Sequence, residues 1–93
     1  MRFSTIKQTV TGVETAPVPV PATPLAGRTS VLVQNVGATT IYIGSSTVTA
    51  GTTATGGIQL LPGQSVPISA GPGAPVFAVS SAASGLVATL EAE

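Results

Sequence analysis

Charged side chains are scarce in this chain of 93 residues. Three are basic and three are acidic, so 6% of the residues are charged, compared with roughly 25% in ordinary soluble proteins. All six lie at or before Arg28 or at Glu91 and Glu93, which leaves residues 29–90 without a formal charge. A chain with a net charge of zero and three scattered cations has no basic patch for nucleic acid and no polybasic membrane anchor.

Several residue types that carry enzyme chemistry are missing altogether. The chain has no His, no Cys and, by inspection, no Asp. A His-based catalytic triad, a thiolate nucleophile and an Asp dyad are therefore excluded, as is a zinc site built from Cys and His. The serine pairs at 45–46 and 80–81 have no base apart from a lone lysine, Lys7. We expect a protein that is not an enzyme and that uses no cofactor.

The remaining polar and aromatic groups give only weak signals of a binding site. Glu91 and Glu93 would point to the same side of a continuing strand, where they form either a weak cation site or, more simply, a solvated chain end. The glycines at 56–57 and 71–73 precede neither a Lys-Ser/Thr pair nor a helix, so they are interpreted as turns rather than phosphate loops. Tyr42 could stack on a sugar, but a single aromatic in a strand is more typical of a core or an interface.

Long apolar runs are also absent, although 43% of the residues are hydrophobic. A membrane-spanning helix needs about 20 apolar residues, and residues 1–8 have no apolar signal-peptide region. Disorder is disfavoured because it requires low hydrophobicity and high net charge. The lack of cysteine fits synthesis in a cytoplasm. A folded, β-rich domain is the class that remains.

Turn residues divide the chain into short segments rich in β-branched residues, which predict strands. We expect the first strand to end at Gly12. Pro67 is expected to confine its strand to an edge or a bulge. Segments 28–35 and 39–44 are expected to form an antiparallel hairpin. Gly37, Gly44, Pro62 and Gly63 are predicted turn residues. The expected strands are 3–11, 28–35, 39–44, 47–50, 58–61, 65–69, 76–80 and 86–90, with a Gly/Thr-rich loop at 51–57.

Residues 14–25 differ from the rest because they hold four prolines. Proline removes backbone donors and favours extended geometry, so this segment is neither a helix nor a central strand. It is interpreted as an exposed linker wrapped over the domain or as an arm that lies along a partner subunit. The predicted organisation is an N-terminal strand and arm at 1–27 followed by a β domain at 28–93. The predicted interface residues of the arm are Pro17, Val18, Pro19, Val20, Pro21 and Leu25.

Several predicted strands are apolar on both faces, for example Val31-Leu32-Val33 and Ile41-Tyr42-Ile43. A solitary antiparallel sandwich alternates apolar and polar residues, so a second covering layer is expected, from the arm, a sister subunit or both. The predicted edges lack the lysines that discourage pairing between sheets, and a chain of this size has a small core. These features favour an obligate assembly over a monomer coated with Thr and Ser. The predicted fold is all-β: a small antiparallel sandwich or barrel, jelly-roll-like, with an extended Pro-rich N-terminal arm.

One set of motifs resembles small structural proteins encoded by tailed bacteriophages. In that pattern a strand ending in Asn leads to a (Val/Ile)-Tyr-(Ile/Leu)-Gly strand, a Gly-x-x-Leu-x-Pro-Gly turn and a (Leu/Val)-(Tyr/Phe)-Ala-(Val/Ile)-Ser strand. The similarity covers roughly residues 28–90, has Phe at position 77 where Tyr is common, and leaves out the arm. The matching segments are Val31-Leu-Val-Gln-Asn35, Ile41-Tyr-Ile-Gly44, Gly57-Ile-Gln-Leu-Leu-Pro-Gly63 and Val76-Phe-Ala-Val-Ser80.

The resemblance implies a virion component on the capsid surface, synthesised in the host cytoplasm, and it brings no catalytic residues. The expected function is that of a capsid decoration (cement) protein that acts as a homo-oligomer, expected to be a homotrimer, with the major capsid protein as its partner. A tail or head-fibre accessory or receptor-binding protein is the alternative within virions. A small carbohydrate-binding module is the alternative from another class, although the three aromatics at Phe3, Tyr42 and Phe77 make an aromatic platform hard to build.

Overall fold

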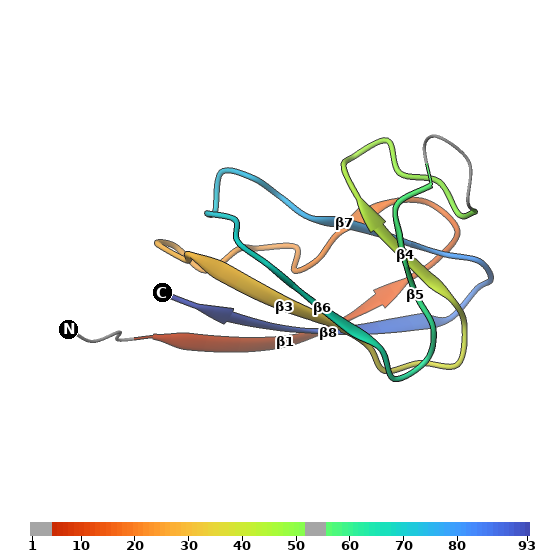
Figure 1. Ribbon diagram of the computed structural model, residues 1–93, viewed down its shortest axis with the longest axis horizontal. Coiled ribbons are helices and arrows are strands. Elements are labelled where there is room, and N and C mark those ends of the chain that lie inside the picture. Colours follow the sequence, from red (N-terminus) through yellow and green to blue (C-terminus); the bar gives the residue numbers. More distant parts are fainter. Residues whose placement is uncertain (1–4, 52–55) are drawn as a thin grey trace.

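The protein is a sandwich of two antiparallel β-sheets (Figure 1). The computed structural model describes residues 5–51 and 56–93, and these residues form strands and turns without a helix. The predicted all-β sandwich is therefore confirmed. Sheet A consists of β1 (Ile6–Val13), β8 (Gly85–Ala92), β3 (Ser30–Asn35) and β6 (Ser65–Ile68), in that spatial order. Sheet B consists of β2 (Val18–Pro19), β7 (Phe77–Ser80), β4 (Ile41–Gly44) and β5 (Ile58–Leu60).

The turn signals located most of the strands, but three expectations about them were wrong. β1 does not end at Gly12 and continues to Val13. The segment at 47–50 is not a strand, since only an isolated bridge joins Thr49 to Gly56. The hairpin expected between 28–35 and 39–44 does not form, because β3 belongs to sheet A and β4 to sheet B. Phe3 and residues 52–55 of the predicted Gly/Thr loop lie outside the described residues.

A buried asparagine lies at the point where the chain leaves sheet A for sheet B. Asn35, at the end of β3, is fully buried. Its Nδ2 donates to the carbonyl oxygens of Thr39 (2.7 Å) and Leu60 (2.9 Å), and its Oδ1 accepts from the amide of Gly37 (3.0 Å). Its backbone accepts from Gly63 (2.8 Å). One side chain thus satisfies backbone groups near two of the connections between the sheets, β3 to β4 and β5 to β6.

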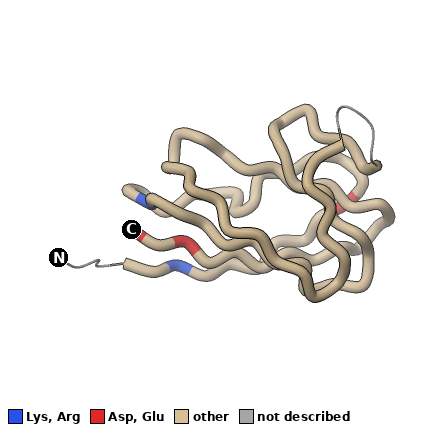
Figure 2. Tube along the Cα trace, viewed as in Figure 1, with Lys and Arg blue, Asp and Glu red and all other residues tan. Residues whose placement is uncertain are grey.

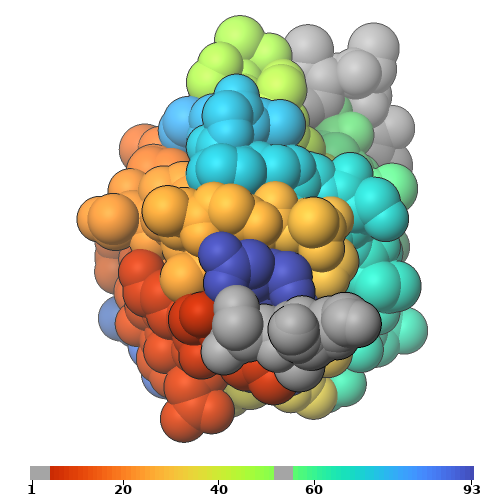
Figure 3. All heavy atoms as spheres, turned by 90° about the vertical axis from the view of Figure 1, so that its left-hand side faces the viewer, coloured from red at the N-terminus to blue at the C-terminus, as the bar shows by residue number. Residues whose placement is uncertain are grey.

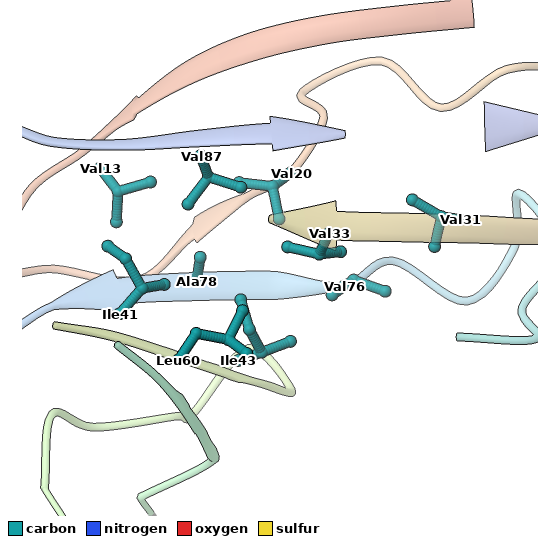
Figure 4. Close-up of a cluster of buried hydrophobic side chains, with 10 residues drawn as sticks. All are labelled: Val13, Val20, Val31, Val33, Ile41, Ile43, Leu60, Val76, Ala78 and Val87. Carbon is teal, nitrogen blue, oxygen red and sulfur yellow. The ribbon is translucent and has the colours of Figure 1, made fainter. Parts of the chain in front are cut away.

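The core between the sheets consists of aliphatic side chains, most of them β-branched (Figure 4). Alternation along β3 places Val31 and Val33 inside and Leu32 outside. Val20, from the Pro-rich segment, is also part of this core. The ten buried residues are Val13, Val20, Val31, Val33, Ile41, Ile43, Leu60, Val76, Ala78 and Val87.

A second, smaller cluster covers the outer face of sheet B. Tyr42 and Val79 are cross-strand neighbours on this face, and Val48 packs against them together with the half-buried Phe77. Val48 comes from the segment that follows β4. The two-sided apolar pattern of β4 is therefore explained by the chain itself, and neither the arm nor a sister subunit is needed to cover sheet B.

Candidate interaction surface

The outer face of sheet A is apolar and is not covered by any other described part of the chain. The strand registers place Leu90 between Gln8 of β1 and Leu32 of β3, and Ala88 between Val10 and Gln34. Directly paired residues project from the same side of a sheet, so these side chains share one surface. We call this surface the apolar face. Its large hydrophobic members are Ile6 (66% exposed), Val10 (65%), Leu32 (39%), Leu86 (42%) and Leu90 (42%).

The centre of the apolar face is a shallow hollow above the small side chain of Ala88. The hollow has a volume of about 220 Å³ and is lined by Gln8, Leu32, Gln34 and Leu90 as well as Ala88. A second hollow adjoins it on the β1 side, near Val10. The two glutamine amides are polar groups within this largely aliphatic surface, and each amide offers both donors and an acceptor.

Among the described residues, no charged side chain belongs to the apolar face. The five described charged residues are Lys7, Glu14, Arg28, Glu91 and Glu93. Figure 2 shows that the charged positions lie toward the two ends of the molecule, with the middle of both sheets uncharged. Burial of the apolar face by a partner would therefore not require the desolvation of a charge, which is the costly part of burying polar surface.

The edges of sheet A discourage uncontrolled strand pairing, contrary to the expectation that lysines would be missing there. β1 is an edge strand and carries Lys7 on its inward side, where Nζ donates to the carbonyl of Thr23 (2.7 Å). An inward-pointing charge on an edge strand is a known device against edge pairing. The opposite edge is β6, so the prediction that Pro67 lies on an edge strand is confirmed.

The Pro-rich arm lies along its own domain. Val18 and Pro19 form β2, which pairs with Ala78 and Phe77 of β7, and the Val20 amide donates to the carbonyl of Val76 (2.8 Å). With β1 in sheet A and β2 in sheet B, residues 1–27 contribute a strand to each layer of the domain that follows.

Burial divides the predicted interface residues of the arm into two groups. Val20 and Pro21, which are joined by a cis peptide bond, are buried in their own domain. Pro17 is exposed, and Val18, Pro19 and Leu25 are half-buried. A contact with another protein through this arm would therefore use the second group.

A buried ion pair holds the end of the arm to the last strand. Arg28 Nη1 lies 2.8 Å from Glu91 Oε2, and neither side chain is exposed. The guanidinium also donates to the carbonyl oxygens of Ala70 and Gly71 through Nε and to that of Ala74 through Nη2. Figure 3 shows the C-terminal segment in dark blue between the red N-terminal strand and the orange segment that includes residue 28.

This ion pair overturns the expectations for the C-terminal carboxylates. Glu91 is neither part of a solvated chain end nor a cation ligand, because its Oε2 is occupied by Arg28 and by the Leu25 amide (2.9 Å). Glu93 is exposed and lies next to Gly27. Residues 5–51 and 56–93 contain no group of three or more potential metal-ligating side chains. Sequence reasoning missed this pair, although its two members are the charges that flank the uncharged stretch.

The predicted turn residues have structural roles. The amide of Gly63, whose φ is +89°, donates to Asn35, and the amide of Gln64 closes the turn at Pro62 by donating to Leu61 (2.9 Å). Gly44 packs against Val48, which covers sheet B. Gly37 lies close to the backbone of Leu86 at the start of β8, where a side chain would collide with it.

Tyr42 and Ser80, two further candidate groups, also have structural roles. Tyr42 is 7% exposed within the cluster on sheet B, so it is not available as a stacking platform for a sugar. Ser80 is fully buried and its Oγ lies 2.7 Å from Thr39 Oγ1. Within the described ranges, no helix has the length and apolar character needed to cross a membrane.

Comparison with known proteins found no match: no family model, no curated protein and no solved structure is detectably similar to this chain.

Proposed function

We propose that this protein is a bacteriophage capsid decoration protein that binds the outside of the head shell as a homo-oligomer. The apolar face carries the proposal, because a small domain that leaves a whole uncharged sheet face exposed is suited to assembly rather than to chemistry. The resemblance of residues 28–90 to virion structural proteins supports the same conclusion. The partners in this proposal are further copies of the chain and the major capsid protein.

Apolar contacts suit a protein that must remain on a particle. Ion pairs between exposed charges weaken as salt rises, whereas apolar contacts do not depend on charge. Many copies on one shell also act together, so that each individual contact can be weak. A chain whose described charges lie away from its exposed sheet face fits this mode of binding.

The arm is proposed to contribute the contact with the shell. Its accessible members are Pro17, Val18, Pro19 and Leu25. Deletion of residues 1–25 would be a poor test, because it removes β1 and β2 and with them one strand of each sheet. A point substitution, Pro17→Glu, leaves both strands in place, and Ala83→Glu in the exposed 81–84 turn is the matched control.

The deciding experiment is to count the copies of the protein in purified particles of the phage that encodes it. Quantitative mass spectrometry against the major capsid protein should give hundreds of copies per particle. A handful of copies would favour the tail or head-fibre alternative, and absence from particles would contradict every virion role. In a second assay, purified protein is added to particles that lack it: Pro17→Glu should weaken saturable binding at least tenfold, and Ala83→Glu should not.

A further inference from the structure

We propose that copies of this chain bind one another through the apolar face. This inference deepens the proposed function and rests on it for the biological role, but the self-association itself can be tested without particles. The face is formed by Ile6, Val10, Leu32, Leu86 and Leu90, with the hollow above Ala88 at its centre. The occupant is a second copy, whose own apolar face meets this one.

The size of the face is of the order that a stable interface requires. β8 has eight residues and runs through the interior of a four-stranded sheet. The other strands have eight (β1), six (β3) and four (β6) residues. At about 3.4 Å per residue and about 4.8 Å per strand, the sheet covers roughly 420 Å² in projection. A standard protein interface buries about 800 Å² of accessible surface per partner, and a surface covered by side chains has more accessible area than its projection.

The composition of the face suits a copy of itself. The described residues of the face carry no charge, so among them two copies neither repel each other nor bury an unpaired ion. Gln8 and Gln34 each carry a donor and an acceptor and can therefore pair with another glutamine across the interface. In shape, Leu90 projects next to the hollow above Ala88 on the same strand. Leu90 of one copy can enter the hollow of a neighbouring copy. By symmetry, the hollow of the first copy then receives Leu90 of another copy in the same closed assembly.

Other routes to self-association are blocked within the described structure. Val48 and its neighbours cover the outer face of sheet B. The edge strands of sheet A carry the inward-pointing Lys7 on β1 and Pro67 on β6, and both disfavour pairing between sheet edges. The two edge strands of sheet B have two and three residues. The outer face of sheet A is the surface that these devices leave open.

The first experiment measures the mass of the purified protein in solution with matched lysine variants. Analytical ultracentrifugation of the unmodified chain should show a closed assembly of two or three copies. Val10→Lys and Leu90→Lys should raise the dissociation constant at least 100-fold. The controls Ile58→Lys and Leu61→Lys carry the same change at positions that are similarly exposed (59% and 47%) but lie off the apolar face, and they should assemble normally. A monomeric unmodified chain, or equal dissociation of the control variants, would overturn the proposal.

A second measurement does not depend on whether a lysine is tolerated. The chain has no cysteine, so Ala88→Cys introduces a single thiol at the centre of the face. Its alkylation by a maleimide should slow at least tenfold as the protein concentration rises through the assembly range. The control Ser46→Cys, at an exposed position away from the face, should react at a constant rate. Equal reactivity of Ala88→Cys at all concentrations would contradict a buried interface.

These results are separable from the test of the proposed function. A monomeric protein that is nevertheless abundant in particles would overturn the self-association face and leave the decoration role intact. If a monomeric protein also lost particle binding through Leu90→Lys, the face would be a shell contact and not a contact between copies. If the protein assembles normally but is absent from particles, the result would support the interface between copies and contradict the virion role.

Discussion

Arg28 Nη1 donates a 2.8 Å hydrogen bond to Glu91 Oε2, and the two residues are 63 positions apart in the chain. Both side chains are withdrawn from solvent. The pair joins the end of the arm to β8, and the remaining donors of Arg28 hold the 70–74 loop through three carbonyl oxygens. The second carboxylate oxygen, Glu91 Oε1, has no hydrogen-bond partner among the described residues. The arrangement therefore depends on Arg28 for charge compensation.

Replacement of Glu91 by glutamine should destabilise the protein strongly. Glu91→Gln keeps the shape of the side chain but leaves the buried guanidinium of Arg28 without a counter-charge, and loss of one member of a buried pair costs about 3–5 kcal/mol. Glu93→Gln, an exposed carboxylate two residues further on, should change the free energy of unfolding by less than about 1 kcal/mol. Urea unfolding followed by circular dichroism measures both, and equal effects of the two substitutions would contradict the structural role of the pair.

Asn35→Asp should also lower stability, because it removes donors at a buried site. The carbonyl oxygens of Thr39 and Leu60 would lose their side-chain donor and face a carboxylate instead. Buried polar groups left unsatisfied cost about 1–3 kcal/mol each, so a loss of roughly 2–4 kcal/mol is expected. Gln64→Glu makes the same amide-to-acid change at an exposed residue, keeps the acceptor for the Leu61 amide, and should be nearly neutral. A mild effect of Asn35→Asp in thermal unfolding would show that the crossover does not need this side chain.

Gly57→Ala tests the close approach of the chain to β4. A Cβ at this position would overlap the carbonyl oxygen of Ile43 and approach Val48 Cγ2 to 2.9 Å. The backbone must move to relieve this overlap, and overpacking of this kind costs about 1–3 kcal/mol or more. Gly12→Ala in β1 has open space around it and should stabilise the strand by about 0.5–1 kcal/mol. The prediction fails if the two alanine variants melt at the same temperature.

Val48→Ala tests whether the segment after β4 protects sheet B. The substitution removes two methyl groups that pack on Tyr42 and Val79. It should lower the free energy of unfolding by about 2 kcal/mol, through lost burial and the cavity left behind. Binding of a hydrophobic dye should rise at the same time, because part of the outer face becomes accessible. Thr47→Ala, at the exposed neighbouring position, should leave both readings unchanged. An unchanged dye signal for Val48→Ala would indicate that this cluster does not shield the sheet.

Much of the architecture followed from local sequence signals. Turn residues such as Pro62-Gly63 bounded the strands, and Pro67 placed β6 at an edge, because both effects depend on backbone geometry within a few residues. The assignment of strands to sheets could not be predicted in this way. A short connection such as 36–40 allows either a hairpin or a crossover, and the crossover is accompanied by a hydrogen bond from Asn35 to Leu60, which is distant in sequence.

The surface was harder to predict than the strands. Val31-Leu32-Val33 is apolar throughout, so its composition alone does not say which side chains face the core. The sequence indicated that a second layer was needed, and for sheet B that layer is the chain's own Val48. Burial of Glu91 depends on Arg28, which lies 63 residues earlier. A contact that requires long-range closure leaves no local pattern, and a carboxylate near a chain end is usually solvated.

The position of β8 also affects when the protein can fold. β8 is the final strand in the sequence, yet it lies in the interior of sheet A and pairs with β1 on one side and β3 on the other. During synthesis neither strand has this partner until β8 has been translated. Sheet A therefore closes through contacts that are distant in sequence, which is a slow step. Unfinished chains would expose two unpaired strand edges, and such species are prone to aggregation.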